Sequence, residues 1–237
     1  YIAMKHLSKL CTDFGVIIDG GKDSLSMAVK HDSMIKAPGS LVLSSYVKCP
    51  NIYKKVTPNL KLSNSYLYFI DLSCGNMNLG GSILSKVLNN IYNEPPYIRN
   101  LHQLKDSFRV LQIMIYFGLI LSGHDKSDGG LITTLLEMSF SSNIGLNITI
   151  PKKYNTSEDI IKFLFNEELG FVVEVDDEYV IEYIKSFDLN VYKIAETTPK
   201  NEINIIHNGK NILQNTVTQM RQKWENPSYQ LEKNQCN

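Results

Sequence analysis

The chain has 237 residues, enough for one large or two small domains with a substantial hydrophobic core. Its 24 basic and 24 acidic residues balance, so the net charge indicates no polyanionic partner such as a nucleic acid. Its most apolar run, residues 113–121, is far shorter than the ~20 residues of a membrane span, and nothing resembles a signal peptide. The dispersed cysteines lack Cys-x-x-Cys spacing, which argues against a zinc site or disulfide framework and favours a reduced, cytoplasmic protein. They are Cys11, Cys49, Cys74 and Cys236.

The N-terminal half is predicted to begin with an amphipathic helix and to continue with short strands. Leu7, Leu10 and Phe14 share one face at helical spacing. Residues 49–63 are polar, contain two prolines and are interpreted as a loop or linker. The elements expected in this half are a helix over 2–14, strands over 16–18, 25–29, 40–47 and 66–72, and helices over about 82–92 and 101–121.

Helices and strands alternate in the C-terminal half. The expected helices cover 131–140, 157–165 and about 179–187, and the expected strands cover 146–150, 171–175, 191–195, 202–206 and 211–213. A terminal helix is predicted over 217–231, with Pro227 kinking or dividing it. This mixture predicts an α+β or α/β fold in which helices are layered on a sheet.

The most informative stretch is residues 124–131, His-Asp-Lys-Ser-Asp-Gly-Gly-Leu, at the start of an apolar segment predicted as a helix. A helix start offers unpaired backbone N–H groups and a partial positive charge, which suit phosphate oxygens. Two carboxylates beside such a site would be explained by a bound Mg²⁺. The alternative is a capped helix, with Asp128 or Ser127 as N-cap and the glycines in a tight turn. The local pattern alone favours this simpler alternative.

A second glycine-rich loop, residues 20–24, follows a predicted strand and has the sequence Gly-Gly-Lys-Asp-Ser. Its backbone and Lys22 could hold phosphate groups, and it superficially resembles the Ser-Gly-Gly-x-Asp-Ser loop of ATP pyrophosphatases. Asp19 in place of the serine, and the strand-like segment after the loop, argue against that interpretation. Residues 71–82 fit neither the dinucleotide-binding nor the Walker spacing, which favours a plain connection there.

Other polar and aromatic side chains receive structural interpretations. Glu167 and Glu168 are adjacent, so on a helix they would diverge by about 100°. They are interpreted as solvated carboxylates at a helix end rather than as an acid–base pair. His124 has no Ser or Cys partner at a spacing typical of a nucleophilic triad. Trp224 and Tyr229 are interpreted as packing anchors.

Several blocks together resemble the phosphoribosylformylglycinamidine synthase family, the glutamine- and ATP-dependent ligases of purine synthesis. Their order and spacing agree from end to end, so the resemblance covers nearly the whole chain. The blocks are residues 19–27, 37–42, 79–82, 123–131, 135–140 and 164–170, and a tail of Trp224-Glu225 and Ser228-Tyr229-Gln230-Leu231. The Asp-Gly-Gly-Lys-Asp-Ser version of the first block is similar to the large single-chain form of eukaryotes.

The resemblance implies an α+β fold, a layered helix and sheet module like the C-terminal domain of the aminoimidazole ribonucleotide synthetase superfamily. It makes residues 1–38 the tail of an ATP-binding-type, N-terminal-like synthetase subdomain. Residues 39–215 would be the C-terminal-like subdomain, and residues 216–237 a terminal helix leading towards a glutaminase domain. The implied partners are small-molecule substrates and the other domains of the same polypeptide, with no nucleic acid and no membrane.

The implied activity converts formylglycinamide ribonucleotide to formylglycinamidine ribonucleotide in de novo purine synthesis, with ATP and with glutamine as amide donor. This segment alone is expected to be inactive, because the remaining metal ligands and the glutaminase would lie outside it. Two alternatives stay open: a stand-alone ATP pyrophosphatase that uses residues 20–24, and a non-catalytic structural nucleotide-binding module.

The family's site residues are carried over by motif match. Asp125 would be a Mg²⁺ ligand, and Ser127 would contact ATP or ADP. Residues 129–130 would form an open helix start that Asp128 caps, and Lys22 is a further candidate near phosphate. A carboxylate is a hard oxygen donor of the kind that Mg²⁺ prefers, and a serine hydroxyl can bond to phosphate.

Overall fold

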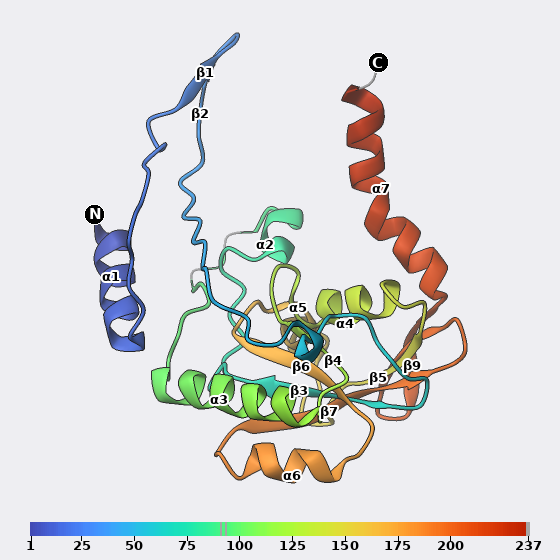
Figure 1. The fold of residues 1–237 in the computed structure, drawn as a ribbon. Coiled ribbons are helices and arrows are strands. Elements are labelled where there is room, and N and C mark those ends of the chain that lie inside the picture. The colour runs from blue at the N-terminus through green and yellow to red at the C-terminus, as the bar shows by residue number, and fades with distance from the viewer. Residues whose placement is uncertain (91, 93, 236–237) are drawn as a thin grey trace. The chain divides into compact units, whose positions relative to one another are not determined.

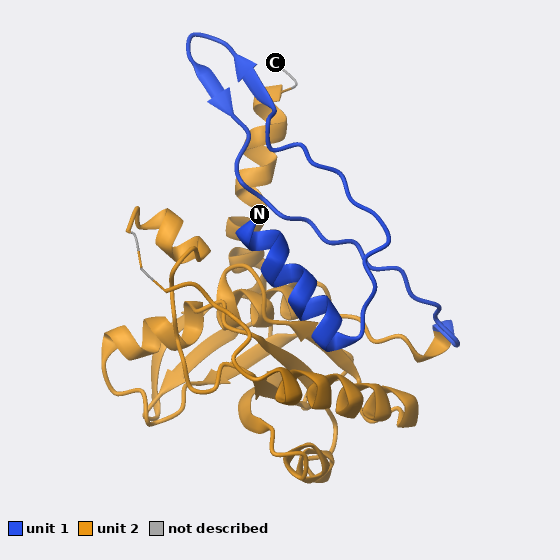
Figure 2. Cartoon of the chain, turned by 90° about the vertical axis from the view of Figure 1, so that its left-hand side faces the viewer, with its two compact units in different colours: residues 1–52 blue, residues 53–237 orange. Residues whose placement is uncertain are grey.

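The structure is a computed structural model, and it describes residues 1–90, 92 and 94–235 (Figure 1). Contacts divide the chain into two units, residues 1–52 and 53–237 (Figure 2). The subdomain boundaries implied by the resemblance, after residues 38 and 215, concern relatedness rather than contacts. They stay a prediction.

The first unit contains one helix and one β-hairpin. Helix α1, Ile2–Phe14, ends at Gly15, whose left-handed backbone lets its N–H bond back to the last turn. Strands β1, Ala28–Lys30, and β2, Met34–Lys36, pair antiparallel. The predicted helix is confirmed, and the predicted strand over 25–29 begins later than expected.

Two further strands expected in this unit do not form. Residues 16–18 and 40–47 have no regular secondary structure, although all of residues 1–52 are described. A strand needs a neighbour that completes its backbone hydrogen bonds. The apolar pattern favours an extended backbone but does not supply that neighbour.

The second unit is built on a seven-stranded sheet in the order β4-β6-β3-β7-β5-β8-β9. Neighbouring strands are antiparallel except β5 and β8, which are parallel. The sequence did not predict β4, which leads into the 124–131 motif. The strands are β3 (Tyr66–Asp71), β4 (Ser122–Asp125), β5 (Gly145–Thr149), β6 (Gly170–Val175), β7 (Asn190–Thr198), β8 (Ile203–His207) and β9 (Lys210–Asn215).

Helices lie on both faces of the sheet, with α4 and α5 on one face and α3 and α6 on the other (Figure 1). On the second face, Phe108 of α3 meets Phe171 of β6 edge to face, with ring centroids 5.6 Å apart. The helices are η1 (Ile52–Lys54, 3-10), α2 (Ile83–Val87), α3 (Leu101–Phe117), α4 (Gly130–Phe140), α5 (Ser157–Phe165), α6 (Tyr179–Lys185) and α7 (Val217–Gln235). This arrangement confirms the α+β, layered helix and sheet fold.

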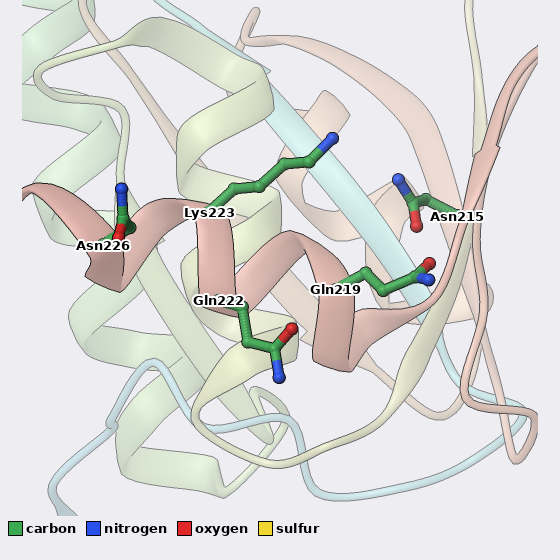
Figure 3. Close-up of a pocket in the computed structure, with 5 residues that line it drawn as sticks. All are labelled: Asn215, Gln219, Gln222, Lys223 and Asn226. Atoms are coloured by element: carbon green, nitrogen blue, oxygen red, sulfur yellow. The ribbon is translucent and has the colours of Figure 1, made fainter.

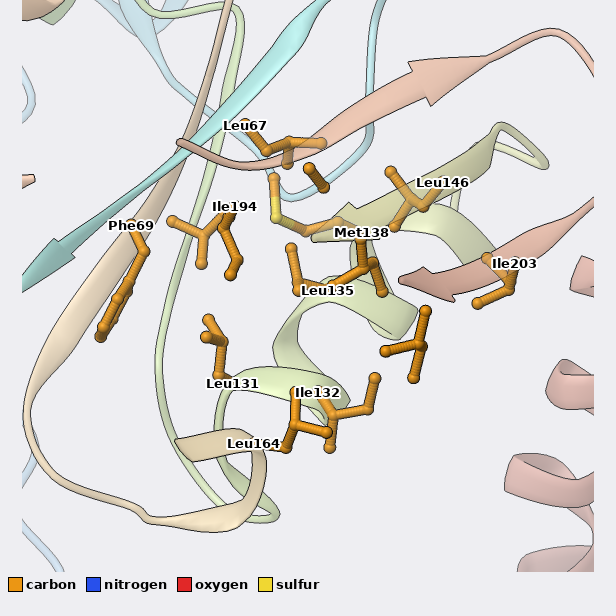
Figure 4. Packing of buried hydrophobic residues seen from close by; sticks show 14 of the residues in the cluster. Leu67, Phe69, Leu131, Ile132, Leu135, Met138, Leu146, Leu164, Ile194 and Ile203 are labelled. Atoms are coloured by element: carbon orange, nitrogen blue, oxygen red, sulfur yellow. The ribbon is translucent and has the colours of Figure 1, made fainter. Parts of the chain in front are cut away.

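The main hydrophobic core lies between the sheet and the helices α4 and α5 (Figure 4). Leu131, Leu135 and Met138 are spaced four and three residues apart, so they share one face of α4, and all three are fully buried. They pack against strand residues that include Leu67, Leu146, Ile194 and Ile203. The core therefore holds α4 from its second residue, Leu131, onward.

Most helix predictions hold, with three main differences. Helix α3 ends at Phe117 rather than near residue 121, because Gly118 terminates it in the left-handed conformation. Helix α5 has the predicted bounds, whereas α2 ends at Val87, short of the predicted 82–92, of which residue 91 lies outside the described residues. Helix α7 continues through Pro227, so that residue does not divide it. Cys236 also lies outside the described residues. No helix in the described part is long and apolar enough to cross a membrane.

Candidate functional site

The 124–131 motif forms the turn between β4 and α4. Exposure alternates along it: Asp125, Ser127 and Asp128 are exposed, whereas Lys126 and the two glycines that follow are buried. The exposed residues all carry side-chain oxygens, and the buried ones face the protein. The turn therefore presents side-chain oxygen atoms to solvent, while its buried residues hold the backbone against the protein.

Asp125 carries the carboxylate at the centre of this turn. The Ser127 hydroxyl donates to Asp125 Oδ2, and His124 Nδ1 lies 3.2 Å from Oδ1. Partial burial raises the pKa of Asp125, but the bonds from Ser127 and the backbone, together with His124, outweigh it and hold the pKa below its usual range. The carboxylate is thus ionised at neutral pH, and 63% of the side chain remains exposed. The structure brings Asp125 and Ser127 together as the motif predicts, while their roles stay predictions.

His124 lies between two carboxylates. Its Nε2 atom is 3.0 Å from Glu137 Oε2 on α4, and its other ring nitrogen faces Asp125. The imidazole therefore connects the end of β4 to α4. These contacts orient the ring beside Asp125.

Lys126 fixes the turn to the neighbouring segment, residues 166–170. Its backbone N–H donates to the Gly170 carbonyl at 2.8 Å, and its ammonium donates to Asn166 Oδ1 at 2.7 Å. Burial lowers the pKa of Lys126 to about 8, against the opposing effect of nearby Asp71 and the carboxylates of the 166–170 segment. The sequence around Lys126 does not indicate this role, because the partners of Lys126 come from another strand and loop.

The predicted capping of α4 is wrong. The N-cap residue is Gly129, with a φ of 83°, and no side chain caps the helix there. The Gly129 N–H instead donates to Glu167 Oε1 at 2.8 Å, so Asp128 is not the cap and this N–H is not open to a phosphate group. At Gly130 a Cβ would lie 2.7 Å from the carbonyl carbon of Phe165. The glycine pair therefore serves close packing of the helix start rather than an open anion site.

Glu167 and Glu168 are not the freely solvated carboxylates that the sequence predicted, because Glu168 is buried and Glu167 is half-buried with two backbone partners. Glu168 is fully buried, and its Oε2 pairs with Arg99 Nη1 at 2.6 Å. Glu167 is half-buried, and its Oε1 accepts from the backbone N–H groups of Gly129 and Ile83, each at 2.8 Å. Both residues follow the end of α5 and enter the interior, where tertiary partners replace water.

Lys22 belongs to the first unit, and its ammonium contacts a residue of its own loop. The Lys22 ammonium donates to the Ser24 hydroxyl, and the Leu25 N–H donates to Asp23 Oδ1 at 2.9 Å. A strand, β1, follows this loop rather than a helix, as the sequence suggested. The proposed position of Lys22 near phosphate stays a prediction.

Two hollows of the second unit involve helix α7. The one in Figure 3 is lined by four amide side chains and one lysine, so it offers no carboxylate to a metal (Asn215, Gln219, Gln222, Lys223 and Asn226). The other adjoins His124 and Glu137. There Trp224 packs on Phe140, with ring centroids 5.9 Å apart. Trp224 is thus in packing contact, whereas Tyr229 is 60% exposed.

Among the described residues, no group of three or more His, Cys, Asp or Glu side chains is arranged to hold a metal ion. Asp125 has the chemistry of a magnesium ligand, because its carboxylate is ionised and exposed next to the Ser127 hydroxyl. It supplies only part of a coordination shell. The remaining oxygens would have to come from phosphate, water or residues outside this turn.

Residues 72–208 match the family described as AIR synthase related protein, C-terminal domain. The chain is 40% identical to phosphoribosylformylglycinamidine synthase of Dictyostelium discoideum over 100% of its own length and 19% of that relative. It is also 40% identical to a probable chloroplastic/mitochondrial phosphoribosylformylglycinamidine synthase of Arabidopsis thaliana (98% and 17%). The human phosphoribosylformylglycinamidine synthase is 37% identical (94% and 17%). The chain thus spans less than a fifth of the length of these relatives.

Solved structures agree on the fold. The structure described as T. maritima PurL complexed with ATP aligns with a TM-score of 0.56 at 13% identity, covering 70% of this chain and 27% of that one. The complex of the same protein with FGAR aligns with a TM-score of 0.57 at 14% identity, covering 70% and 29%. Together with the match over residues 72–208, this shows that the chain belongs to the family of AIR synthase related proteins, through their C-terminal domain.

Proposed function

We propose that this chain is part of an ATP-dependent carbon–nitrogen ligase that converts formylglycinamide ribonucleotide to formylglycinamidine ribonucleotide in purine synthesis. Relatives with that synthase name match it at 37–40% identity along nearly its whole length. Within the chain, we place a Mg²⁺-nucleotide site at the turn between β4 and α4. The observation that carries this site is the ionised, exposed Asp125 carboxylate bonded to Ser127 on a turn fixed by buried residues.

Each side chain of the turn has a defined part in this proposal. Asp125 would hold Mg²⁺ through a carboxylate oxygen, and Ser127, which now donates to Asp125, would contact ATP or ADP. Bound Mg²⁺ would neutralise charge on the phosphate oxygens. His124 keeps the carboxylate oriented by its contact to Oδ1. Lys22 is the weaker candidate near phosphate.

The wider setting follows from the relatives. Glutamine would be the amide donor, and the chain alone would neither hydrolyse glutamine nor hold ATP tightly, because it spans less than a fifth of those proteins. Its partners would be the ribonucleotide, ATP, ammonia and the other domains of the same polypeptide. We place the protein in the cytoplasm.

The test is calorimetric binding of Mg²⁺-ADP to the full-length polypeptide before and after Asp125→Asn. The amide keeps the shape but loses the charge that attracts the metal, so we expect affinity to fall at least about tenfold, or 1.4 kcal/mol. Asp106→Asn, in an exposed pair with Arg109 on α3, is the matched control and should bind normally. Unchanged affinity in Asp125→Asn would refute the metal assignment. Loss of adenylation in Ser24→Ala, with Asp125→Ala unaffected, would instead favour the pyrophosphatase.

A further inference from the structure

The turn that carries Asp125 and Ser127 is held in place by one short segment, residues 166–170. Asn166 accepts the Lys126 ammonium at 2.7 Å, and Glu167 accepts the Gly129 N–H at 2.8 Å. The fixed residues, 126, 129 and 130, alternate with the exposed ones. The positions of the exposed oxygens therefore depend on contacts to residues that do not themselves face the ligand.

Among these residues, Glu167 joins the turn to a second helix start. Its Oε1 atom accepts from the Gly129 N–H at the start of α4 and from the Ile83 N–H at the start of α2. Backbone N–H groups at helix starts favour a negative partner, so a single carboxylate oxygen satisfies donors of both helices. Glu167 thus connects the turn to α2, whose Ile83 lies 84 residues before Glu167 in the sequence.

A phosphate group does not fit beside the Gly130 Cα at the start of α4. The Gly130 Cα faces the chain at residues 164–166 so closely that even a methyl group would lie within 2.8 Å of three backbone atoms. The space beside the helix start is therefore already filled by protein. The open side of the turn is the one that carries Asp125 and Ser127.

We propose that Glu167 is a positioning residue for the Mg²⁺-nucleotide site, which fixes the backbone at Gly129 so that Asp125 and Ser127 keep a common orientation. This inference rests on the proposed function of those two residues. Glu167 does not touch the nucleotide. Glu167 acts through the turn, and its side chain must be long enough to bring an acceptor oxygen to the Gly129 N–H.

The test compares three substitutions in the full-length polypeptide by Mg²⁺-ADP calorimetry. Glu167→Ala removes the acceptor and should weaken binding about fivefold to tenfold. Glu167→Asp keeps the charge but shortens the side chain, so it should also weaken binding. Glu167→Gln keeps an acceptor oxygen at the same reach and should bind within about twofold of the wild type. If Glu167→Ala does not fold, the Asp and Gln variants carry the same comparison.

A matched control separates positioning from general loss of stability. Thr156 caps α5 through a capping box with Asp159, and Thr156→Ala should cost about 1 kcal/mol of stability without touching the turn. It should leave Mg²⁺-ADP affinity unchanged. If Glu167 only stabilises the fold, Thr156→Ala and Glu167→Ala should lose the same Mg²⁺-ADP affinity whenever they lose the same melting temperature.

Other outcomes overturn the inference in distinct ways. Wild-type affinity in Glu167→Ala would show that the contact is dispensable, and tighter binding would show that Glu167 competes with phosphate. If Glu167→Gln binds Mg²⁺-ADP as weakly as Glu167→Ala, the acceptor oxygen is not what positions the turn. If Asp125→Asn binds like the wild type, the proposed site itself fails, whereas loss in Asp125→Asn with normal Glu167→Ala refutes only the positioning role.

Discussion

At the scale of single residues, Gly130 occupies a position where backbone conformation and packing both require glycine. Its φ is +74°, and a Cβ there would lie 2.8 Å from the carbonyl oxygen of Asn166. Gly209 has the same φ of +74°, but nothing lies within 4 Å of its Cβ position. Gly209 therefore shows the effect of the left-handed backbone alone, whereas Gly130 combines it with close packing.

Substitution of these glycines by alanine should give unequal losses of stability. Gly209→Ala incurs only the left-handed backbone, which costs about 1 kcal/mol. Gly130→Ala adds a clash with backbone that cannot rotate away, for a total loss of roughly 2–4 kcal/mol. Denaturant unfolding of both variants measures the difference. Equal losses would contradict the view that the Gly-Gly pair serves packing.

At the scale of elements, strand β6 holds the loop before β3 through one buried carboxylate. Glu174 has no exposed surface. It accepts from the Lys61 N–H at 2.9 Å, the Leu62 N–H at 3.0 Å and the Ser65 hydroxyl at 2.7 Å. A carboxylate offers only acceptors, which is what these donors need. The loop is thereby attached to β6, the strand next to the edge strand β4.

Glu174→Gln should destabilise the protein by about 2–3 kcal/mol, because the new NH₂ group faces backbone donors and leaves one of them unsatisfied. Glu196→Gln is the matched control on β7, which is separated from β6 by β3. That carboxylate is 53% exposed and pairs with Lys193, so its loss should cost below about 1 kcal/mol. Urea unfolding midpoints compare the two. A loss in Glu174→Gln no larger than in the control would show that the loop is held by other contacts.

Helices and strands with a strong local sequence pattern could be predicted, whereas strands that depend on pairing with a distant strand could not. Helix α5 was predicted with its bounds, because apolar residues at helical spacing follow the capping residue Thr156. Strand β4 was missed because Ser-Gly-His-Asp has little intrinsic preference for a strand, and only pairing with β6 makes it one. Residues 16–18 show the reverse case, a strand-like pattern without a partner.

At the scale of the whole molecule, the layered α+β fold could be predicted from the alternation of helices and strands. The site was predictable only in part. Asp125 and Ser127 could be selected because a sequence motif carries them. The partners that fix their turn, Lys126, Asn166 and Glu167, could not, since hydrogen bonds between segments about 40 residues apart leave no local pattern. The solvated-carboxylate interpretation of Glu167 failed for the same reason.

Direct binding of the metal ion by Asp125 can be tested by a change in metal preference. In Asp125→Cys the ligand atom becomes sulfur, which prefers a softer ion than Mg²⁺. Calorimetry of ADP binding to the full-length polypeptide should show loss of affinity with Mg²⁺ and recovery with Cd²⁺, whereas Asp125→Ala should recover with neither ion. Undiminished Mg²⁺-ADP affinity in Asp125→Cys, or equal loss with both ions, would contradict direct ligation by Asp125.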